Sequence, residues 1–117
     1  RWTVISRQTW LMIAADTGIT VLAGMFTPVP DGRVTNTLLA VGPGVDTHYD
    51  KIHLYDAFGS RESDTVEAGH DVVTFAALGT TIGLATCYDL RFADQFTALG
   101  RADGRLFGAD PRAHEEM

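Results

Sequence analysis

Residues 80–92 have the sequence TTIGLATCYDLRF, and their pattern predicts a strand, a sharp turn and the start of a helix. Residues 81–86 are small and apolar, which is typical of a buried strand, and the polar residues after Cys87 are typical of a helix start. A side chain at such a strand-to-helix turn lies at the carboxyl edge of a sheet, where free backbone N–H groups stabilise negative charge. Cys87, the only cysteine in the chain, is therefore a candidate nucleophile.

The segments around this turn predict an α/β domain that has one mainly antiparallel β-sheet with helices on one face. Ser6 and Gly18 are the expected caps of a helix over residues 7–17. The apolar run over residues 19–26 predicts a central strand that is covered on both faces. The other predicted elements are strands over 34–41, 46–53, 71–77 and 81–86, a long loop over 54–70, and a helix over 91–100.

The composition restricts the classes of partner. The chain has 117 residues, of which 45% are hydrophobic, and a formal net charge of −6. Its acidity argues against nucleic-acid binding, which requires clustered Lys and Arg. No apolar run approaches the ~20 residues of a membrane span, so no membrane partner is expected. A single cysteine excludes an internal disulfide and fits a reducing compartment, so we expect a cytoplasmic location.

The two ends predict one partial domain over residues 1–117. The first residue is Arg rather than Met, so we expect the sequence to start inside a longer chain. Residues 101–117 lose the hydrophobic alternation of the middle, and Pro111 interrupts any helix there. We expect this tail to be frayed, truncated or out of frame, with a native solvated terminus as the alternative.

A second stretch, HYDKIHLYDAFGSRES at residues 48–63, supplies groups that could act with Cys87. A free thiol near neutral pH is mostly protonated, so a cysteine nucleophile needs a base or a positive environment. This stretch offers Lys51 and Glu62. Taken singly, Lys51 and Glu62 also fit a solvated surface, and Cys87 also fits a small buried hydrophobic residue.

Taken together, these motifs resemble a known family. YDKIHLYDAFGSRESDTVEAG followed by GLATCYDLRF is similar to the nitrilase superfamily of carbon–nitrogen hydrolases, nearest to its amidase, ω-amidase and deaminated-glutathione-amidase-like branches. The upstream pieces GITVLAG and VTNTLLAVGPG also fit, and the resemblance covers roughly residues 10–100. It implies an αββα sandwich, of which this chain would supply about one sheet, incomplete at both ends.

The resemblance also implies a role for each matching residue. Cys87 would attack an amide or nitrile carbon and form a thioester. Lys51 and the backbone N–H of Tyr88 would stabilise the oxyanion. Glu62 would hold the lysine and order the attacking water, while Asp89 and Arg91 would support the turn. We therefore expect Lys51 Nζ and Cys87 Sγ to share a pocket, with Glu62 near Lys51.

No cofactor or metal ion is expected for this chemistry. The expected partners are a small-molecule amide substrate and water, and the full-length protein could form a homo-oligomer of the family type.

The chain departs from the family pattern at the general base. The family uses a glutamate upstream of the lysine to take the thiol proton, and this sequence has no glutamate before Glu62. None of the upstream aspartates, Asp16, Asp31, Asp46 and Asp50, stands in a matching motif. Ala93 and Asp94 replace the usual Pro-Glu pair, and no strand pattern follows Gly100. We therefore predict that this polypeptide alone is inactive.

Three alternatives stay open. The first is a non-catalytic remnant that acts as a binding or assembly module. The second is a Cys-His hydrolase in which His53 or His70 activates Cys87, although no matching local signature surrounds the thiol. The third is a metal site, although His48, Asp50 and His53 form no recognised ligand set. For His53 we expect a packing or hydrogen-bonding role.

Overall fold

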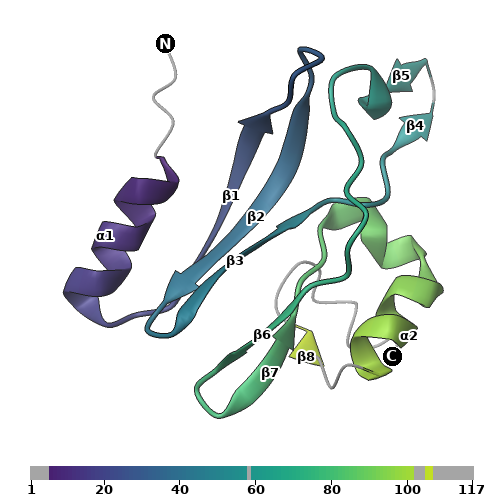
Figure 1. Cartoon of the computed structure of the whole chain (residues 1–117). Coiled ribbons are helices and arrows are strands. Elements are labelled where there is room, and N and C mark those ends of the chain that lie inside the picture. The colour runs from purple at the N-terminus through teal and green to yellow at the C-terminus, as the bar shows by residue number, and fades with distance from the viewer. Residues whose placement is uncertain (1–5, 58, 102–104, 107–117) are drawn as a thin grey trace.

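The computed structural model describes residues 6–57, 59–101 and 105–106. Two helices, eight strands and two 3₁₀ turns lie within these ranges (Figure 1). The helices are α1 (Arg7–Thr17) and α2 (Ala93–Arg101), and the 3₁₀ turns are η1 (Glu62–Asp64) and η2 (Cys87–Arg91). The strands are β1 (Val21–Pro28), β2 (Val34–Gly42), β3 (Val45–Asp50), β4 (Asp56–Ala57), β5 (Ser60–Arg61), β6 (Thr74–Ala77), β7 (Thr80–Gly83) and β8 (Arg105–Leu106).

The first helix has the predicted bounds because both of its ends are capped. The Ser6 hydroxyl accepts a 3.2 Å hydrogen bond from the Thr9 N–H. Gly18 takes the left-handed conformation at φ 72°, and its N–H donates to the Ala14 carbonyl at 2.8 Å. Only glycine adopts this conformation without a steric cost, so the helix ends there.

The strands form antiparallel pairs, which confirms the α/β class. Strands β1, β2 and β3 form one antiparallel sheet, β4 and β5 form a short ribbon, and β6 and β7 form a hairpin. Strand β8 pairs parallel with β7, with Ile82 opposite Arg105 and Gly83 opposite Leu106. The sequence pattern had indicated no strand after Gly100, so β8 corrects that expectation. The rest of the predicted tail, residues 107–117, lies outside the described residues.

The central strand of the first sheet is β2, not β1. Leu39 and Val41 pack against α1, and Ala40, on the opposite face, joins the cluster that reaches the β6–β7 hairpin. Strand β1 lies at the edge, with Leu22 43% and Phe26 59% exposed. The prediction of a strand covered on both faces was therefore wrong for residues 19–26. A continuous apolar run does not by itself distinguish a central strand from an edge strand.

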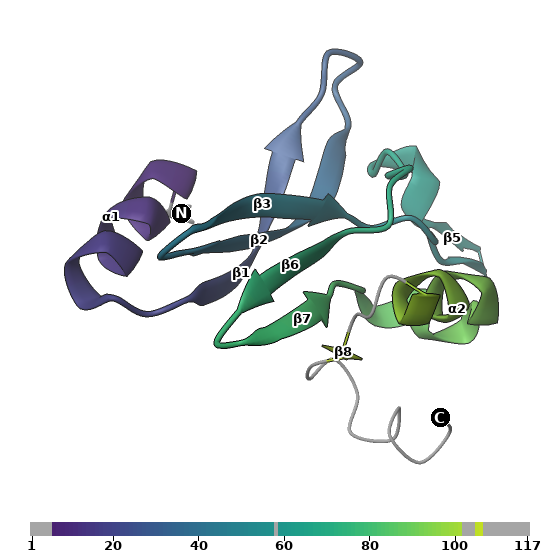
Figure 2. The same cartoon turned by 60° about the horizontal axis from the view of Figure 1, so that its bottom comes forward.

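Each three-stranded sheet has its own helix, α1 against β2 and α2 against β7. Phe75 and Ile82 of the β6–β7 hairpin pack with Tyr49 of β3 in a single apolar cluster. On the far side of β7, a Cβ at Gly83 would lie 2.7 Å from Leu99 Cδ2, which shows how closely α2 approaches. Figure 2 shows α1 and α2 at opposite ends of the molecule. No helix in the described ranges is long and apolar enough to cross a bilayer.

Candidate active site

Cys87 lies at a sharp turn between β7 and α2. It is the first residue of η2, it is exposed, and its φ of 46° is in the left-handed region. That conformation costs a non-glycine residue about 1–2 kcal/mol, and such strain often marks a functional site. Leu78, the other described non-glycine residue with positive φ, occupies the tight hairpin turn between β6 and β7. At Cys87 no hairpin explains the strain.

Asp89 fixes the shape of this turn. The Thr86 N–H donates to Asp89 Oδ2 at 2.9 Å, and the Asp89 N–H donates back to the Thr86 carbonyl at 3.0 Å. This reciprocal cap closes the chain around Cys87, which stands between the two residues. Asp89 is fully buried, so its carboxylate depends on protein donors in place of water. The supporting role of Asp89 stays a prediction, and these contacts are the ones that such a role requires.

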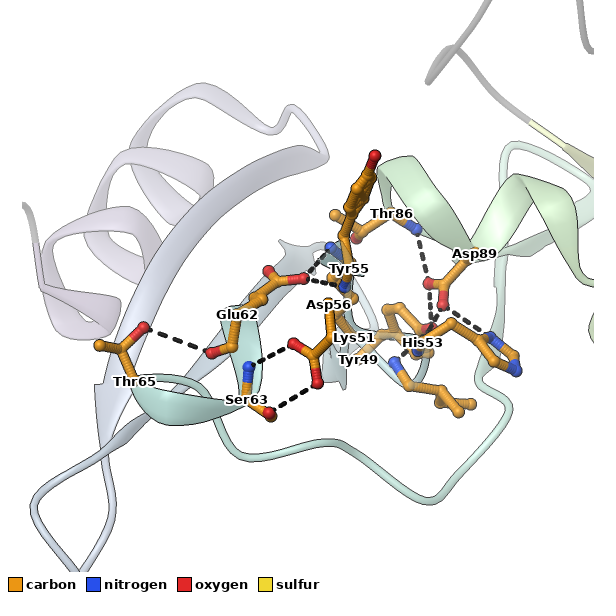
Figure 3. A network of polar contacts seen from close by, with 11 residues as sticks. Tyr49, Lys51, His53, Tyr55, Asp56, Glu62, Ser63, Thr65, Thr86 and Asp89 are labelled. Carbon is orange, nitrogen blue, oxygen red and sulfur yellow. Dashed lines mark hydrogen bonds and ion pairs between the residues drawn. The ribbon is translucent and has the colours of Figure 1, made fainter. Parts of the chain in front are cut away.

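The same carboxylate holds the chain segment that carries Lys51. Asp89 Oδ1 accepts the His53 backbone N–H and contacts His53 Nδ1, both at 2.9 Å. Asp89 Oδ2 also accepts the Tyr49 hydroxyl (Figure 3). Tyr49 and His53 stand two residues before and two residues after Lys51. Asp89 therefore clamps the segment around Lys51 to the turn at Cys87.

The Tyr49 hydroxyl is the centre of a buried polar network. It donates to Asp89 and accepts from the Ile52 N–H at 3.1 Å and from Gln95 Nε2 at 2.9 Å. Burial, and then the neighbouring Asp89 carboxylate, raise the pKa of Tyr49 above its ordinary value. The phenol therefore keeps its proton and remains a donor to Asp89 throughout the physiological pH range.

Lys51 is the only lysine in the chain, and its side chain is buried against Glu62. Its Nζ lies 2.7 Å from Glu62 Oε1, which also accepts the Tyr55 backbone N–H at 2.7 Å. The predicted approach of Glu62 to Lys51 is confirmed. A buried ammonium group without an opposite charge would be strongly unfavourable, and the Glu62 carboxylate supplies that opposite charge at Lys51.

The segment predicted as a long loop is organised around Glu62. Strands β4 and β5 form a two-residue ribbon, and η1 begins at Glu62 itself. Asp56 accepts the Ser63 N–H at 3.0 Å and the Ser63 hydroxyl at 2.7 Å, and these bonds lower the pKa of the Asp56 carboxyl. The ribbon and the turn thus fix the backbone position from which Glu62 reaches Lys51.

Aromatic contacts join the same two segments a second time. The His53 ring stacks on Phe92 with centroids 3.8 Å apart and an interplanar angle of 6°. The Tyr55 ring contacts Tyr88 at 5.0 Å, and Tyr88 contacts Phe92 edge-on at 5.2 Å. The packing and hydrogen-bonding role predicted for His53 is confirmed. Its Nδ1 is directed to Asp89 and not to the thiol.

The structure brings some of the predicted site residues together and leaves others as predictions. Lys51 and Glu62 are in direct contact, and Asp89 joins their segment to the turn of Cys87. The shared pocket of Lys51 and Cys87 and the oxyanion role of the Tyr88 N–H stay predictions. Arg91 is exposed, and its supporting role also stays a prediction.

The sequence interpretation missed two members of the network, Tyr49 and Gln95. Strand alternation places Tyr49 on the same side as Val45, so an inward orientation could have been predicted. Gln95 carried no comparable signal, because a glutamine in the first turns of a surface helix is normally solvated.

Gly69, whose backbone is hydrogen-bonded to that of Lys51, gives a first test of how tightly the Lys51 segment is packed. The Gly69 N–H donates to the Lys51 carbonyl at 2.9 Å, and a Cβ at position 69 would lie 2.1 Å from the Asp50 carbonyl oxygen. Gly69→Ala must move the backbone beside Lys51, and we expect it to lower the free energy of unfolding by about 1–3 kcal/mol. Urea unfolding followed by circular dichroism measures this change.

The matched control for this substitution is Gly24→Ala. A Cβ at Gly24 would meet no atom within 4 Å. The free energy of unfolding of Gly24→Ala should therefore stay within about 0.5 kcal/mol of that of the original protein or rise slightly. Equal free energies of unfolding for the two variants would show that the backbone around Gly69 can shift at little cost in stability.

Comparisons with known proteins place this geometry in a family. The sequence model described as "Carbon-nitrogen hydrolase" matches residues 5–116. Hydrolase MT0498 of Mycobacterium tuberculosis is 55% identical over 98 residues, which cover 80% of this chain and 35% of that protein. A deaminated glutathione amidase of Escherichia coli O157:H7 is 40% identical over 78 residues, which cover 65% of this chain and 30% of the relative.

The fold is also shared with a solved structure. Nit3 of Saccharomyces cerevisiae, a member of branch 10 of the nitrilase superfamily, superposes with a TM-score of 0.69 at 22% identity, over 83% of this chain and 35% of Nit3. The chain spans about a third of the length of these relatives. On the match over residues 5–116, the chain belongs to the carbon–nitrogen hydrolase family.

Proposed function

We propose that this domain belongs to an enzyme that hydrolyses a carbon–nitrogen bond of a small amide through a thioester on Cys87. The observation that carries the proposal is the buried Lys51–Glu62 pair, on a segment that Asp89 ties to the strained turn of Cys87. The relative named deaminated glutathione amidase supports a small amide as the substrate class, with a nitrile as the related alternative.

In the proposed reaction, the Cys87 thiolate attacks the amide carbon. Negative charge then develops on the carbonyl oxygen, where Lys51 Nζ and the Tyr88 N–H stabilise it. The C–N bond breaks, the nitrogen takes a proton and leaves as ammonia or an amine, and a thioester remains on Cys87. Water, ordered by Glu62, attacks the thioester and releases the carboxylic acid and the free thiol. A donor aimed at such an oxyanion typically contributes about 10²–10³ in rate.

The general base is the missing element of this proposal. The sequence given contains no glutamate before Glu62. Loss of a general base lowers a rate by about 10²–10⁴-fold, so we propose that the 117-residue polypeptide alone is inactive. We also propose that the active form has additional residues before Arg1, encoded in frame, and that they supply a glutamate after a strand. This longer polypeptide is called the extended protein below.

Other properties of the working protein follow from the same proposal. A catalytic thiol works in its reduced form, and the single cysteine fits a reducing compartment, so we propose a cytoplasmic location. The proposed partners are the amide substrate and water, with assembly into a family-type homo-oligomer. The net charge of −6 supports the absence of nucleic-acid and anionic-membrane partners.

The test of this function is ammonia release from glutaramate and succinamate. The 117-residue polypeptide should release none above background, because the proton acceptor for Cys87 is lacking. The extended protein should release ammonia, and its Cys87→Ala variant should release none, because no other group in the proposed site can form the thioester.

Three results would contradict the proposal. Turnover by the 117-residue polypeptide that disappears in Cys87→Ala would show that a base is already present among its residues. An extended protein that turns over amides equally well with Cys87→Ala would exclude the thioester mechanism. An extended protein without any amide turnover would favour a non-catalytic binding or assembly module.

A further inference from the structure

The Tyr49–Gln95 contact is a part of the polar network that the proposed reaction does not use. Tyr49 lies in the apolar cluster of β3, β6 and β7, and its residue is fully buried. Its hydroxyl takes part in three hydrogen bonds, which involve η2 through Asp89, the backbone beside Lys51 through Ile52, and α2 through Gln95. One oxygen atom therefore connects the three elements that surround the candidate site.

This oxygen is placed to set the position of Lys51 relative to Cys87. The Ile52 N–H, immediately after Lys51, donates to the hydroxyl at 3.1 Å, so the residues flanking Lys51 fold back on Tyr49. The hydroxyl in turn donates to Asp89 Oδ2, the same oxygen that accepts the Thr86 N–H and so caps the turn at Cys87. Loss of the hydroxyl removes one of the links between the Lys51 segment and the turn, and it leaves Lys51 and Cys87 in place.

Gln95 fixes the direction of that hydroxyl. Gln95 Nε2 donates to Tyr49 Oη at 2.9 Å, which leaves the Tyr49 proton free to point at Asp89. Gln95 is 4% exposed, and its Oε1 has no hydrogen-bond partner among the described residues. A buried amide whose acceptor is unpaired loses part of the stability that its donor contributes, so Gln95 stabilises the fold less than a fully paired amide would.

We propose that Tyr49 and Gln95 are positioning residues, which hold Lys51 at its working distance from Cys87 through Asp89. The proposal rests on the proposed function for its catalytic meaning. Neither residue touches the reacting atoms. Small displacements of a catalytic group carry a large penalty, since an error of about 1 Å can lower a rate by about 10²-fold.

The first experiment uses the 117-residue polypeptide and needs no turnover. Cys87 is its only thiol and is exposed, so the rate of its alkylation by iodoacetamide reports on the environment of the turn. Tyr49→Phe keeps the ring in the apolar cluster and removes the oxygen. We expect the alkylation rate to fall about tenfold, because the proposed placement of Lys51 beside the thiol is then lost.

Two further variants separate positioning from a merely structural role. Tyr55→Phe removes the hydroxyl of a tyrosine that is 40% exposed, and its alkylation rate should stay within about twofold of the original. Gln95→Met removes the donor to Tyr49 together with the unpaired Oε1, so its thermal midpoint should be unchanged or higher. Its alkylation rate should nevertheless fall, which a purely structural residue would not produce.

The second experiment measures kcat and KM of the extended protein. Tyr49→Phe and Gln95→Met should lower kcat about 10- to 100-fold at unchanged KM, since they displace a group that acts only in the transition state. If folded Tyr49→Phe keeps both its kcat and its alkylation rate, this inference is wrong. The proposed function would still hold in that case, provided that Cys87→Ala abolishes turnover. Turnover that survives Cys87→Ala would instead overturn the proposed function, and the alkylation rates would decide the positioning role separately.

Discussion

Replacing Asp89 with alanine is expected to lower the free energy of unfolding by about 3–5 kcal/mol, the largest stability effect of any substitution considered. The fully buried carboxylate accepts the Thr86 and His53 N–H groups and the Tyr49 hydroxyl, and it contacts the His53 ring. Alanine leaves all these donors buried without an acceptor, and each unpaired group adds to the loss. Chemical denaturation of the 117-residue polypeptide measures the change.

The matched control is Asp64→Ala. Asp64 is an exposed aspartate whose carboxylate lies 3.8 Å from Arg61, with both side chains 68% exposed. Exposed pairs of this kind contribute little, so its stability should stay within about 0.5 kcal/mol of the original. An Asp89→Ala variant as stable as this control would show that the clamp is not what joins the two segments.

Replacing Lys51 with methionine should lower kcat of the extended protein by about 10²–10³-fold. Methionine keeps the length and apolar contacts of the stem and removes the positive charge proposed to face the oxyanion. Glu62 is 21% exposed at its side chain, so water can solvate it when its partner is lost. The protein should therefore stay folded, and ammonia release under saturating amide measures the loss of the chemical step.

Arg61→Met is the control for Lys51→Met. It removes a cation from the neighbouring ribbon, but that cation is exposed and pairs only at the surface. Its kcat should stay within about twofold of the original, because an exposed charge is screened by solvent. Retention of full kcat in Lys51→Met would exclude Lys51 from the proposed oxyanion site.

Local signals in the sequence were sufficient where the interactions are local. The caps at Ser6 and Gly18 fixed both ends of α1, because each bond spans only a few residues. The pairing of β1 with β2 and of β6 with β7 likewise followed from apolar runs separated by short turns. These elements could be predicted because their determinants are neighbours in the chain.

Predictions failed where a distant partner decides the outcome. Strand β1 has the composition of a central strand, yet it lies at a sheet edge because only β2 pairs with it among the described strands. Strand β8 has only two residues and acquires its structure by pairing with β7. The sequence of a short or uniformly apolar segment carries little information about which strands will lie beside it in the sheet.

For the candidate site, the sequence by itself determined which residues are the candidates for the chemistry: one cysteine after an apolar strand, one lysine, and a glutamate eleven positions beyond it in a polar segment. Only the tertiary structure decided how they are held. Lys51 is buried against Glu62, and the buried Asp89 carboxylate joins Tyr49 and His53 to the turn of Cys87. A buried charge is stable only where folding supplies partners from other segments, and those partners are set by three-dimensional packing rather than by sequence spacing.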